Sequence, residues 1–171
     1  DGLKDKLRGR KGVGGISGGV DSTTASILIS KIEATQYHPI FVDNGLLRLN
    51  EAQRVKESLE PIGLSIRYID ASKRFLDRLR GVTDPDEKRK RIGNDFISVF
   101  EEEARKIQGA SYLVQGTLYP DVIESVPIYG SSSKIKRHHN VGGLPEKMNL
   151  EVIEPFRLMF KDEVRKIAEN K

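Results

Sequence analysis

A short loop rich in glycine and hydroxyl groups constrains this chain more than any other part of its sequence. It reads Ser17-Gly18-Gly19-Val20-Asp21-Ser22 and is followed directly by Thr23 and Thr24. Paired glycines allow a tight turn and a close approach of the backbone to a ligand. The residues that follow repeat at the spacing of a helix, so that its first N–H groups and positive dipole end form an anion site. Its apolar residues are Ala25, Leu28, Ile29 and Ile32. Asp21 adds a carboxylate that can hold Mg²⁺ beside phosphate oxygens.

The loop differs from two common phosphate-binding motifs. No G-x-x-x-x-G-K-[ST] sequence occurs and no lysine follows the glycines, which excludes a Walker loop. Gly12-Val13-Gly14 begins a dinucleotide fingerprint, but Ser17 stands where its third glycine belongs. The loop resembles the pyrophosphate loop of the N-type ATP pyrophosphatases, which cleave ATP between its α and β phosphates. An ordinary Gly-Gly turn before a helix is the alternative, but the clustered hydroxyls and carboxylate favour a phosphate site.

Composition narrows the class of protein. The 171 residues predict one domain, and no apolar run or signal pattern predicts contact with a membrane, so we expect a cytoplasmic protein. The absence of cysteine excludes disulfides and any thiol nucleophile, hence a cysteine-dependent glutaminase, on this chain. The net charge of +4 suits an anionic ligand. Because aromatic residues make up only 6% of the chain, we expect a nucleotide rather than nucleic acid.

Short apolar runs alternate with helical patterns, which predicts an α/β fold: an open parallel sheet with helices on both faces. The expected strands are Val13–Ile16, Pro39–Val42, Leu64–Ile69, Tyr112–Gln115 and Glu151–Glu154.

Three helices carry sequence signals at their ends or on their apolar faces. Asn50 is predicted to cap one helix with Gln53 closing the capping box, and Asp84-Pro85-Asp86-Glu87 predicts a second that runs to about Ile107. A last helix is predicted from Phe160, Val164, Ile167 and Ala168. Residues 126–149 lack periodicity and predict a mobile loop.

Polar, glycine-containing segments follow three of these strands. They are Ser17–Ser22, Asp43-Asn44-Gly45 and Gln115-Gly116-Thr117. Because ligands of open parallel sheets bind beyond the carboxyl ends of the strands, we expect the three segments to form one pocket.

Two clusters of charged residues each have two interpretations. Asp121 and Glu124, three residues apart, can bind Mg²⁺ or polarise a nucleotide base, or can simply be acids that favour a helix N-terminus. Lys88-Arg89-Lys90-Arg91 can be a solvated face, or can face an anion that offsets the unfavourable dipole at the start of a helix.

The pair His138-His139 can likewise be interpreted in two ways, as metal ligands or as part of a cationic clamp. Neighbouring residues do not share a face of a helix or strand, so a metal site is disfavoured. With Lys136 and Arg137 just before it, the pair fits a cationic clamp in a loop.

Several segments in the same order resemble one family, the GMP synthetases, in their ATP-pyrophosphatase domain. The matching segments are Ser17–Thr23, Phe41–Arg48, Gly81–Pro85 with Lys88–Lys90, Gln115–Ser125, Ile135–Pro145 and Phe160–Arg165. The first is shared with NAD, asparagine and argininosuccinate synthetases, whereas His138-His139-Asn140-Val141-Gly142-Gly143 is more selective.

The resemblance implies an adenine nucleotide alpha hydrolase-like fold and a two-step reaction. ATP with Mg²⁺ adenylylates the C2 oxygen of xanthosine monophosphate, and ammonia then displaces AMP to give GMP. The implied ATP-binding residues are Ser17, Gly18, Gly19, Val20, Asp21 (with Mg²⁺), Ser22, Thr23, Val42 and Gly116. The implied catalytic residues are Asp121, Glu124, Lys136, His138, His139 and Lys161, and Arg89 is the implied substrate-phosphate ligand.

The resemblance also implies partner domains, and the sequence differs from the family at one strand. A glutaminase domain or subunit would supply ammonia and a C-terminal domain would form a homodimer; the match implies that residues 1–171 end before that domain and turn over slowly without it. The first strand has glycines where the family has apolar residues, so we expect it to be loose. Another ATP pyrophosphatase, such as a NAD synthetase-like one, and an inactive ATP-binding module remain the alternatives.

Overall fold

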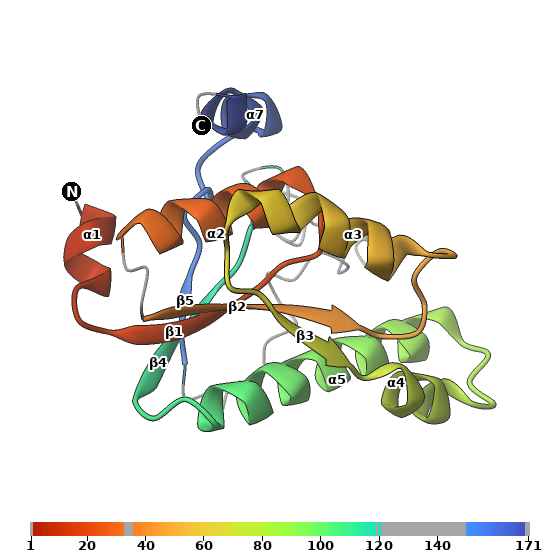
Figure 1. The fold of residues 1–171 in the computed structure, drawn as a ribbon. Helices are drawn as coiled ribbons and strands as arrows, with labels where there is room; N and C mark the ends of the chain where they lie inside the picture. Colours follow the sequence, from red (N-terminus) through yellow and green to blue (C-terminus); the bar gives the residue numbers. More distant parts are fainter. Residues whose placement is uncertain (1, 33–35, 119, 121–149, 170–171) are drawn as a thin grey trace, which may run out of the picture.

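The computed structural model describes residues 2–32, 36–118, 120 and 150–169 and contains one five-stranded sheet (Figure 1). The strand order is β3-β2-β1-β4-β5, and every neighbouring pair is parallel. The strands are β1 (Lys11–Gly15), β2 (Tyr37–Asp43), β3 (Arg67–Asp70), β4 (Ala110–Val114) and β5 (Glu151–Ile153). The predicted open parallel sheet is confirmed.

Helices cover both faces of the sheet (Figure 1). The elements are α1 (Gly2–Leu7), α2 (Val20–Ile32), α3 (Glu51–Leu59), the 3₁₀ helix η1 (Glu60–Ile62), α4 (Ser72–Leu79), α5 (Pro85–Arg105) and α7 (Lys161–Glu169). Helices α2 and α3 lie on one face, α4 and α5 on the other, and α7 packs against α2. Each face has its own buried cluster, one around Ile29 and Phe156 and the other around Phe75 and Val99.

The central strand β1 is tightly packed, so the expectation of a loose first strand is wrong. It also lies earlier than predicted, at Lys11–Gly15. Tyrosine rings of both neighbouring strands occupy the space beside its glycines. A Cβ on Gly12 would lie 2.1 Å from Cε2 of Tyr112, and one on Gly14 would lie 2.1 Å from the hydroxyl of Tyr37. The glycines of β1 therefore make room for the two rings.

The Tyr37 side chain is fixed at its far end as well. Its hydroxyl forms a hydrogen bond of 2.8 Å with Ser26 Oγ in α2. Burial raises the pKa of Tyr37 far above its ordinary value, so the hydroxyl stays protonated. This bond joins the centre of the sheet to the helix that follows the glycine loop.

The cap and the proline at the start of α5 are as predicted, but the carboxylate of Glu87 pairs with Arg91 instead of closing a capping box on Asp84. Asp84 is the N-cap, and its Oδ1 accepts a hydrogen bond of 2.8 Å from the Glu87 N–H, with Pro85 in the first turn. The helix ends at Arg105, and Ile107 still packs against the buried cluster of that face.

The predicted capping box at Asn50 is wrong. Asn50 has a φ of 59° and its side chain makes no capping hydrogen bond. The carboxylate of Glu51 instead accepts a 2.7 Å hydrogen bond from the Arg48 N–H, while Gln53 bonds to Glu57 one turn later. A left-handed backbone at Asn50 turns its side chain away from the first helical N–H groups.

Other boundaries differ by a few residues. The third strand begins at Arg67 rather than Leu64, because Leu64 and Ile66 form a turn after η1. In the last helix Val164 is fully buried, but Phe160 precedes the helix and is 53% exposed. The predicted loop at 126–149 lies outside the described residues. None of the helices described in the structure is both long and apolar enough to cross a membrane.

We expect acid to destabilise the fold through His38 in β2. Burial, together with the nearby charges of Arg67 and Lys11, lowers the pKa of His38 from 6.5. The unfolded chain therefore takes up this proton first, and the free energy of unfolding should fall as the pH drops through about 6.5. The free energy of unfolding, measured with urea at several pH values between 8 and 5, should depend less steeply on pH in His38→Gln than in the unmodified chain. An unchanged slope would contradict the prediction.

Candidate functional site

The loop Ser17–Gly19 connects the carboxyl end of β1 to the first turn of α2 and is held by hydroxyl groups. Ser22 Oγ lies 3.0 Å from Ser17 Oγ, accepts a 3.1 Å hydrogen bond from the Ser17 N–H and donates to the Gly19 carbonyl at 3.2 Å. The Gly19 N–H in turn donates to Ser17 Oγ at 3.3 Å. These bonds curl the backbone around the start of α2, where its N–H groups favour an anion.

Gly18 must be glycine for two reasons: its backbone conformation and the lack of room for a side chain. Its φ is 81°, which favours glycine, and a Cβ there would lie 2.6 Å from Cγ2 of Val55 in α3. Helix α3 thus supports the loop from outside. No local signal in the sequence indicates this contact, because Gly18 and Val55 lie far apart along the chain.

Asp21 lies in the first turn of α2, and one of its carboxylate oxygens lacks a hydrogen-bond partner among the described residues. Its Oδ1 is buried and makes no hydrogen bond with the described residues, and the same holds for Thr23 Oγ1. Its Oδ2 lies 3.9 Å from Nζ of Lys161 at the start of α7. A buried, unsatisfied carboxylate oxygen is rare in proteins and calls for a ligand or ion.

This donor set fits Mg²⁺ bound together with a nucleotide. Mg²⁺ in such sites takes one or two carboxylates and fills its remaining positions with phosphate oxygens and water. Asp21 can supply one carboxylate. The described residues contain no group of three or more His, Cys, Asp or Glu side chains that would hold a metal alone.

Gly116, just beyond β4, forms the neighbouring wall of the site. A Cβ on Gly116 would lie 3.0 Å from the Ser22 nitrogen and 3.1 Å from the Ser22 Cα. Gln115 before it donates its N–H to the Ile153 carbonyl at 3.0 Å. The ends of β1 and β4 are therefore brought together as the sequence predicted.

The end of β2 contributes backbone rather than side chains. Val42 is buried, with its side chain in the cluster facing α4 and α5, so only its main chain can face a ligand. Asp43 Oδ1 accepts a 2.8 Å hydrogen bond from the Gly45 N–H, and Gly45 has a φ of 72°. This segment turns the chain away at the same edge of the sheet as the Ser17–Gly19 loop.

Arg89 lies in the second turn of α5. Its Nη1 pairs with Asp86 Oδ1 at 2.9 Å on the surface of the helix, and both side chains are more than half exposed. The remaining predicted site residues, Asp121, Glu124, Lys136, His138 and His139, lie outside the described residues.

Solved structures define the class of this domain. The fold matches an NH3-dependent NAD synthetase from Campylobacter jejuni, in complex with the nitrate ion, with a TM-score of 0.72 and 11% identity, over 99% of this chain and 69% of that one. An NMN synthetase from Francisella tularensis matches with a TM-score of 0.68 and 14% identity, over 98% and 65%. The domain therefore has the predicted adenine nucleotide alpha hydrolase-like fold.

Sequence relatives narrow the class further. The glutamine-hydrolyzing GMP synthase of Christiangramia forsetii is 54% identical over 166 residues, 97% of this chain and 33% of that protein. That of Aquifex aeolicus is 57% identical over 158 residues, 92% of this chain and 31% of that protein. No family model matches the chain.

The predicted resemblance to GMP synthetase is thus confirmed: over nearly its whole length the chain is homologous to one segment of glutamine-hydrolyzing GMP synthases. It spans about a third of the length of the curated relatives that it matches.

Proposed function

We propose that this domain carries out the ATP-dependent chemistry of GMP synthesis. The C2 oxygen of xanthosine monophosphate attacks the α-phosphorus of ATP and pyrophosphate leaves; ammonia then attacks C2, and AMP leaves with that oxygen and its electron pair. The observation that carries the proposal is the identity of 54% and 57% to two GMP synthases over nearly the whole chain.

The loop geometry supports a role in holding the pyrophosphate part of ATP. Ser17, Gly18, Gly19, Val20, Ser22 and Thr23 would supply backbone N–H groups and hydroxyls to its oxygens. The backbones of Val42 and Gly116 would form walls of the same site. Transfer of a phosphorus group depends mainly on positioning and on neutralising spread negative charge, which fixed N–H groups at a helix start can provide.

Asp21 would hold Mg²⁺ in this site. The metal, when bound, would neutralise phosphate oxygens. Lys161, whose Nζ lies 3.9 Å from Asp21 Oδ2, would add a cation beside the same phosphates and so act on the leaving pyrophosphate. The orphaned Oδ1 of Asp21 supports the metal assignment.

Arg89 would bind the phosphate of xanthosine monophosphate after leaving its exposed pair with Asp86, which is a weak interaction. Five more residues would act in a loop that closes on the substrates: Asp121, Glu124, Lys136, His138 and His139. In the whole protein we place a glutaminase domain or subunit as ammonia donor, a C-terminal dimerisation domain and a cytoplasmic setting, with neither nucleic acid nor membrane as a partner.

Exchange of labelled pyrophosphate into ATP tests the proposal. It should require xanthosine monophosphate, with ammonia left out, because adenylylation of this acceptor is the reversible first step. Exchange with nicotinate adenine dinucleotide instead would favour a NAD synthetase-like enzyme, whose solved representative here is only 11% identical. Mg-ATP binding without exchange on any acceptor would favour a silent binding module.

We expect Asp21→Asn to weaken Mg-ATP binding while leaving metal-free ATP binding nearly unchanged. The substitution keeps the shape of the side chain and removes the charge that Mg²⁺ requires. Calorimetry with and without Mg²⁺ measures both affinities. Asp5→Asn, on the exposed face of α1, serves as the matched control. Equal Mg-ATP affinity in the two variants would remove Asp21 from the site.

A further inference from the structure

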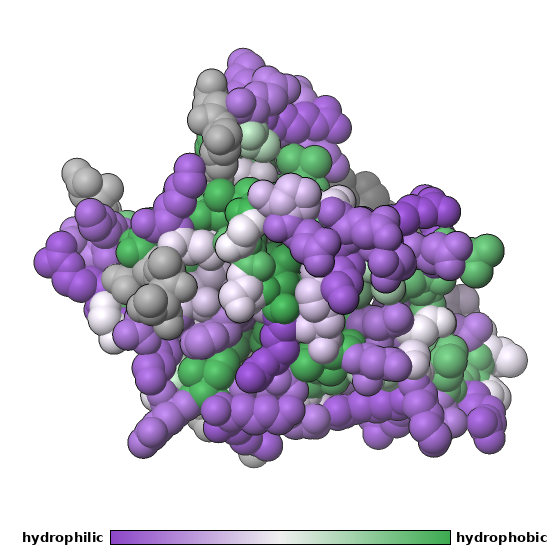
Figure 2. All heavy atoms as spheres, viewed as in Figure 1, coloured by the Kyte–Doolittle hydropathy of each residue, from purple (hydrophilic) through white to green (hydrophobic). Residues whose placement is uncertain are grey.

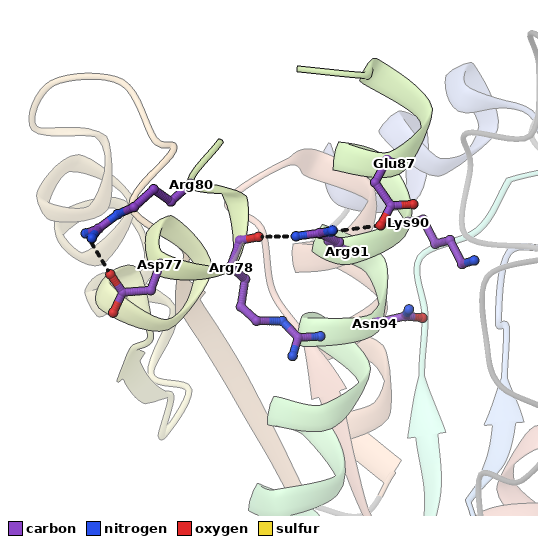
Figure 3. A pocket seen from close by; sticks show the side chains of 7 residues that line it. All are labelled: Asp77, Arg78, Arg80, Glu87, Lys90, Arg91 and Asn94. Atoms are coloured by element: carbon purple, nitrogen blue, oxygen red, sulfur yellow. Dashed lines mark hydrogen bonds and ion pairs between the residues drawn. The ribbon is translucent and has the colours of Figure 1, made fainter. Parts of the chain in front are cut away.

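A hollow of about 510 Å³ lies between α4 and the first turns of α5 (Figure 3). Its lining is dominated by charge, with four cationic side chains against two carboxylates. The cations are Arg78, Arg80, Lys90 and Arg91, and the carboxylates are Asp77 and Glu87. We call this feature the α4–α5 hollow.

Two guanidinium groups of the hollow are held in place before any ligand arrives. Arg78 Nε lies 3.4 Å from Oδ1 of Asp95, a carboxylate of α5 that is only 5% exposed. Arg91 donates from Nε to Glu87 Oε1 at 2.8 Å and from Nη1 to the Arg78 carbonyl at 2.9 Å (Figure 3). Groups that are already ordered lose less conformational entropy when they bind a ligand.

The other cations differ in how they are paired. Arg80 Nη2 pairs with Asp77 Oδ1 at 3.2 Å, and hydrogen bonding from Lys73 keeps the pKa of Asp77 below its ordinary value. Lys90 has no ion-pair partner within 4.0 Å among the described residues, and in Figure 3 it extends away from Glu87. Four cationic side chains gathered in one hollow, against two carboxylates, repel one another. An anion in the hollow would offset this repulsion.

The hollow is separate from the acceptor site proposed above. Glu87, Lys90 and Arg91 share one face of α5, whereas Arg89 falls about 200° around the helix from Glu87. Arg89 is accordingly absent from the lining and pairs with Asp86. The charge run that the sequence left open to two interpretations thus divides between two faces of one helix.

We propose that the α4–α5 hollow binds the phosphate group of a small phosphorylated metabolite, outside the ATP site. The planar forks of Arg78 and Arg91 match the oxygens of a phosphate, which they can bind in pairs. The volume accommodates a phosphate with a small organic group attached. The described lining contains no aromatic side chain on which the bases of a nucleic acid strand would stack.

Asp95 is a positioning residue for this site, acting through Arg78. Its Oδ2 is buried and makes no hydrogen bond with the described residues, so the carboxylate interacts through its other oxygen with Arg78 and, at 3.9 Å, with Nε of Arg74. Asp95→Asn removes the charge while keeping the shape. It should weaken phosphate binding by less than the loss of Arg78 itself, with the melting temperature measured alongside.

Calorimetric titration with inorganic phosphate and with ribose 5-phosphate tests the proposal, against sodium chloride at equal ionic strength. Arg78→Gln and Arg91→Gln should each weaken binding of both probes by about tenfold or more, because each removes a charge-assisted pair of hydrogen bonds. Arg105→Gln, at the far end of α5 and paired only on the surface with Glu101, should bind as the unmodified chain does. Arg89→Gln should remove only binding at the proposed acceptor site, and the component of binding that Arg78→Gln and Arg91→Gln abolish should remain, which separates the hollow from that site.

Three results would overturn the proposal. One is binding of both probes that is insensitive to Arg78→Gln and Arg91→Gln. Another is equal binding of chloride, which would reduce the hollow to a diffuse positive surface. A third is failure of both probes to bind while a single-stranded oligonucleotide or an acidic peptide binds through the same arginines, which would assign the surface to a macromolecule. Circular dichroism of each variant confirms that it is folded, and Arg78→Lys, which keeps the charge without the fork, should bind with intermediate affinity.

Discussion

Gly12→Ala should lower the free energy of unfolding by about 3 kcal/mol or more, at the upper end of the cost of overpacking a core. The added Cβ would lie 2.1 to 2.4 Å from three ring carbons of Tyr112, which is itself fully buried in the neighbouring strand β4. Neither group can move easily, because β1 is paired on both sides and Tyr112 lies within a buried cluster. Urea unfolding measures the loss.

A second glycine and a compensating change serve as controls for Gly12→Ala. Gly93 lies within α5, and a methyl group added there would meet no atom within 4 Å, so Gly93→Ala should instead stabilise the chain by up to about 1 kcal/mol. Adding Tyr112→Leu to Gly12→Ala should cost less than the sum of the two single changes, because the smaller side chain makes room for the methyl group. Strict additivity, or an unchanged stability of Gly12→Ala alone, would contradict the packing described for β1.

Gly18→Ala should weaken Mg-ATP binding by about tenfold or more, because the strain of about 1–2 kcal/mol at a left-handed backbone, together with a clash, would be relieved by moving the loop. A side chain at a φ of 81° is strained, and its Cβ would approach Val55 Cγ2 to 2.6 Å. The loop that is proposed to hold the phosphates would have to move away from α3. Calorimetry with Mg-ATP measures the change.

Gly9→Ala separates the two causes of this effect. Gly9 has a similar φ of 69°, but no atom lies within 4 Å of its Cβ position, so its substitution carries backbone strain without a clash. It should lower stability by about 1 kcal/mol and leave Mg-ATP affinity unchanged. Adding Val55→Ala to Gly18→Ala should restore part of the affinity. If Gly18→Ala binds Mg-ATP as Gly9→Ala does, the loop is not the phosphate site.

Local sequence signals predicted the parts of the fold that depend on neighbouring residues. The cap at Asp84 followed from three adjacent positions, and the loop before α2 followed from its glycines and hydroxyls. Asn50 showed the same cap pattern, but its left-handed backbone overrides the side-chain preference. Helix α4 was not predicted, although Ala71, Phe75 and Leu79 recur at the four-residue spacing of a helix and could have indicated it.

Contacts between distant residues could not be predicted from such signals. The pairing of Gly12 with Tyr112 joins positions 100 residues apart, and a glycine-rich strand alone suggests looseness rather than tight packing. The support of Gly18 by Val55 and the anchoring of Arg78 by Asp95 likewise depend on how helices are placed around the sheet. The face of the molecule in Figure 2 is mostly hydrophilic, in keeping with the charged content of 32%.

The strand order has a consequence for the sequence of events during folding. Strands β3, β2 and β1 come from the first 70 residues and can pair early, but β1 gains its second neighbour only when β4, at residues 110–114, arrives. Pairing across so long a stretch of chain carries a loop-closure cost and is slow. Because Gly116 directly follows β4 in the chain, the wall that it forms next to Ser22 is completed in this late step. A refolding chain should thus acquire much of its helical signal before it acquires the complete edge of the sheet, and nucleotide should accelerate only what happens after β4 has docked.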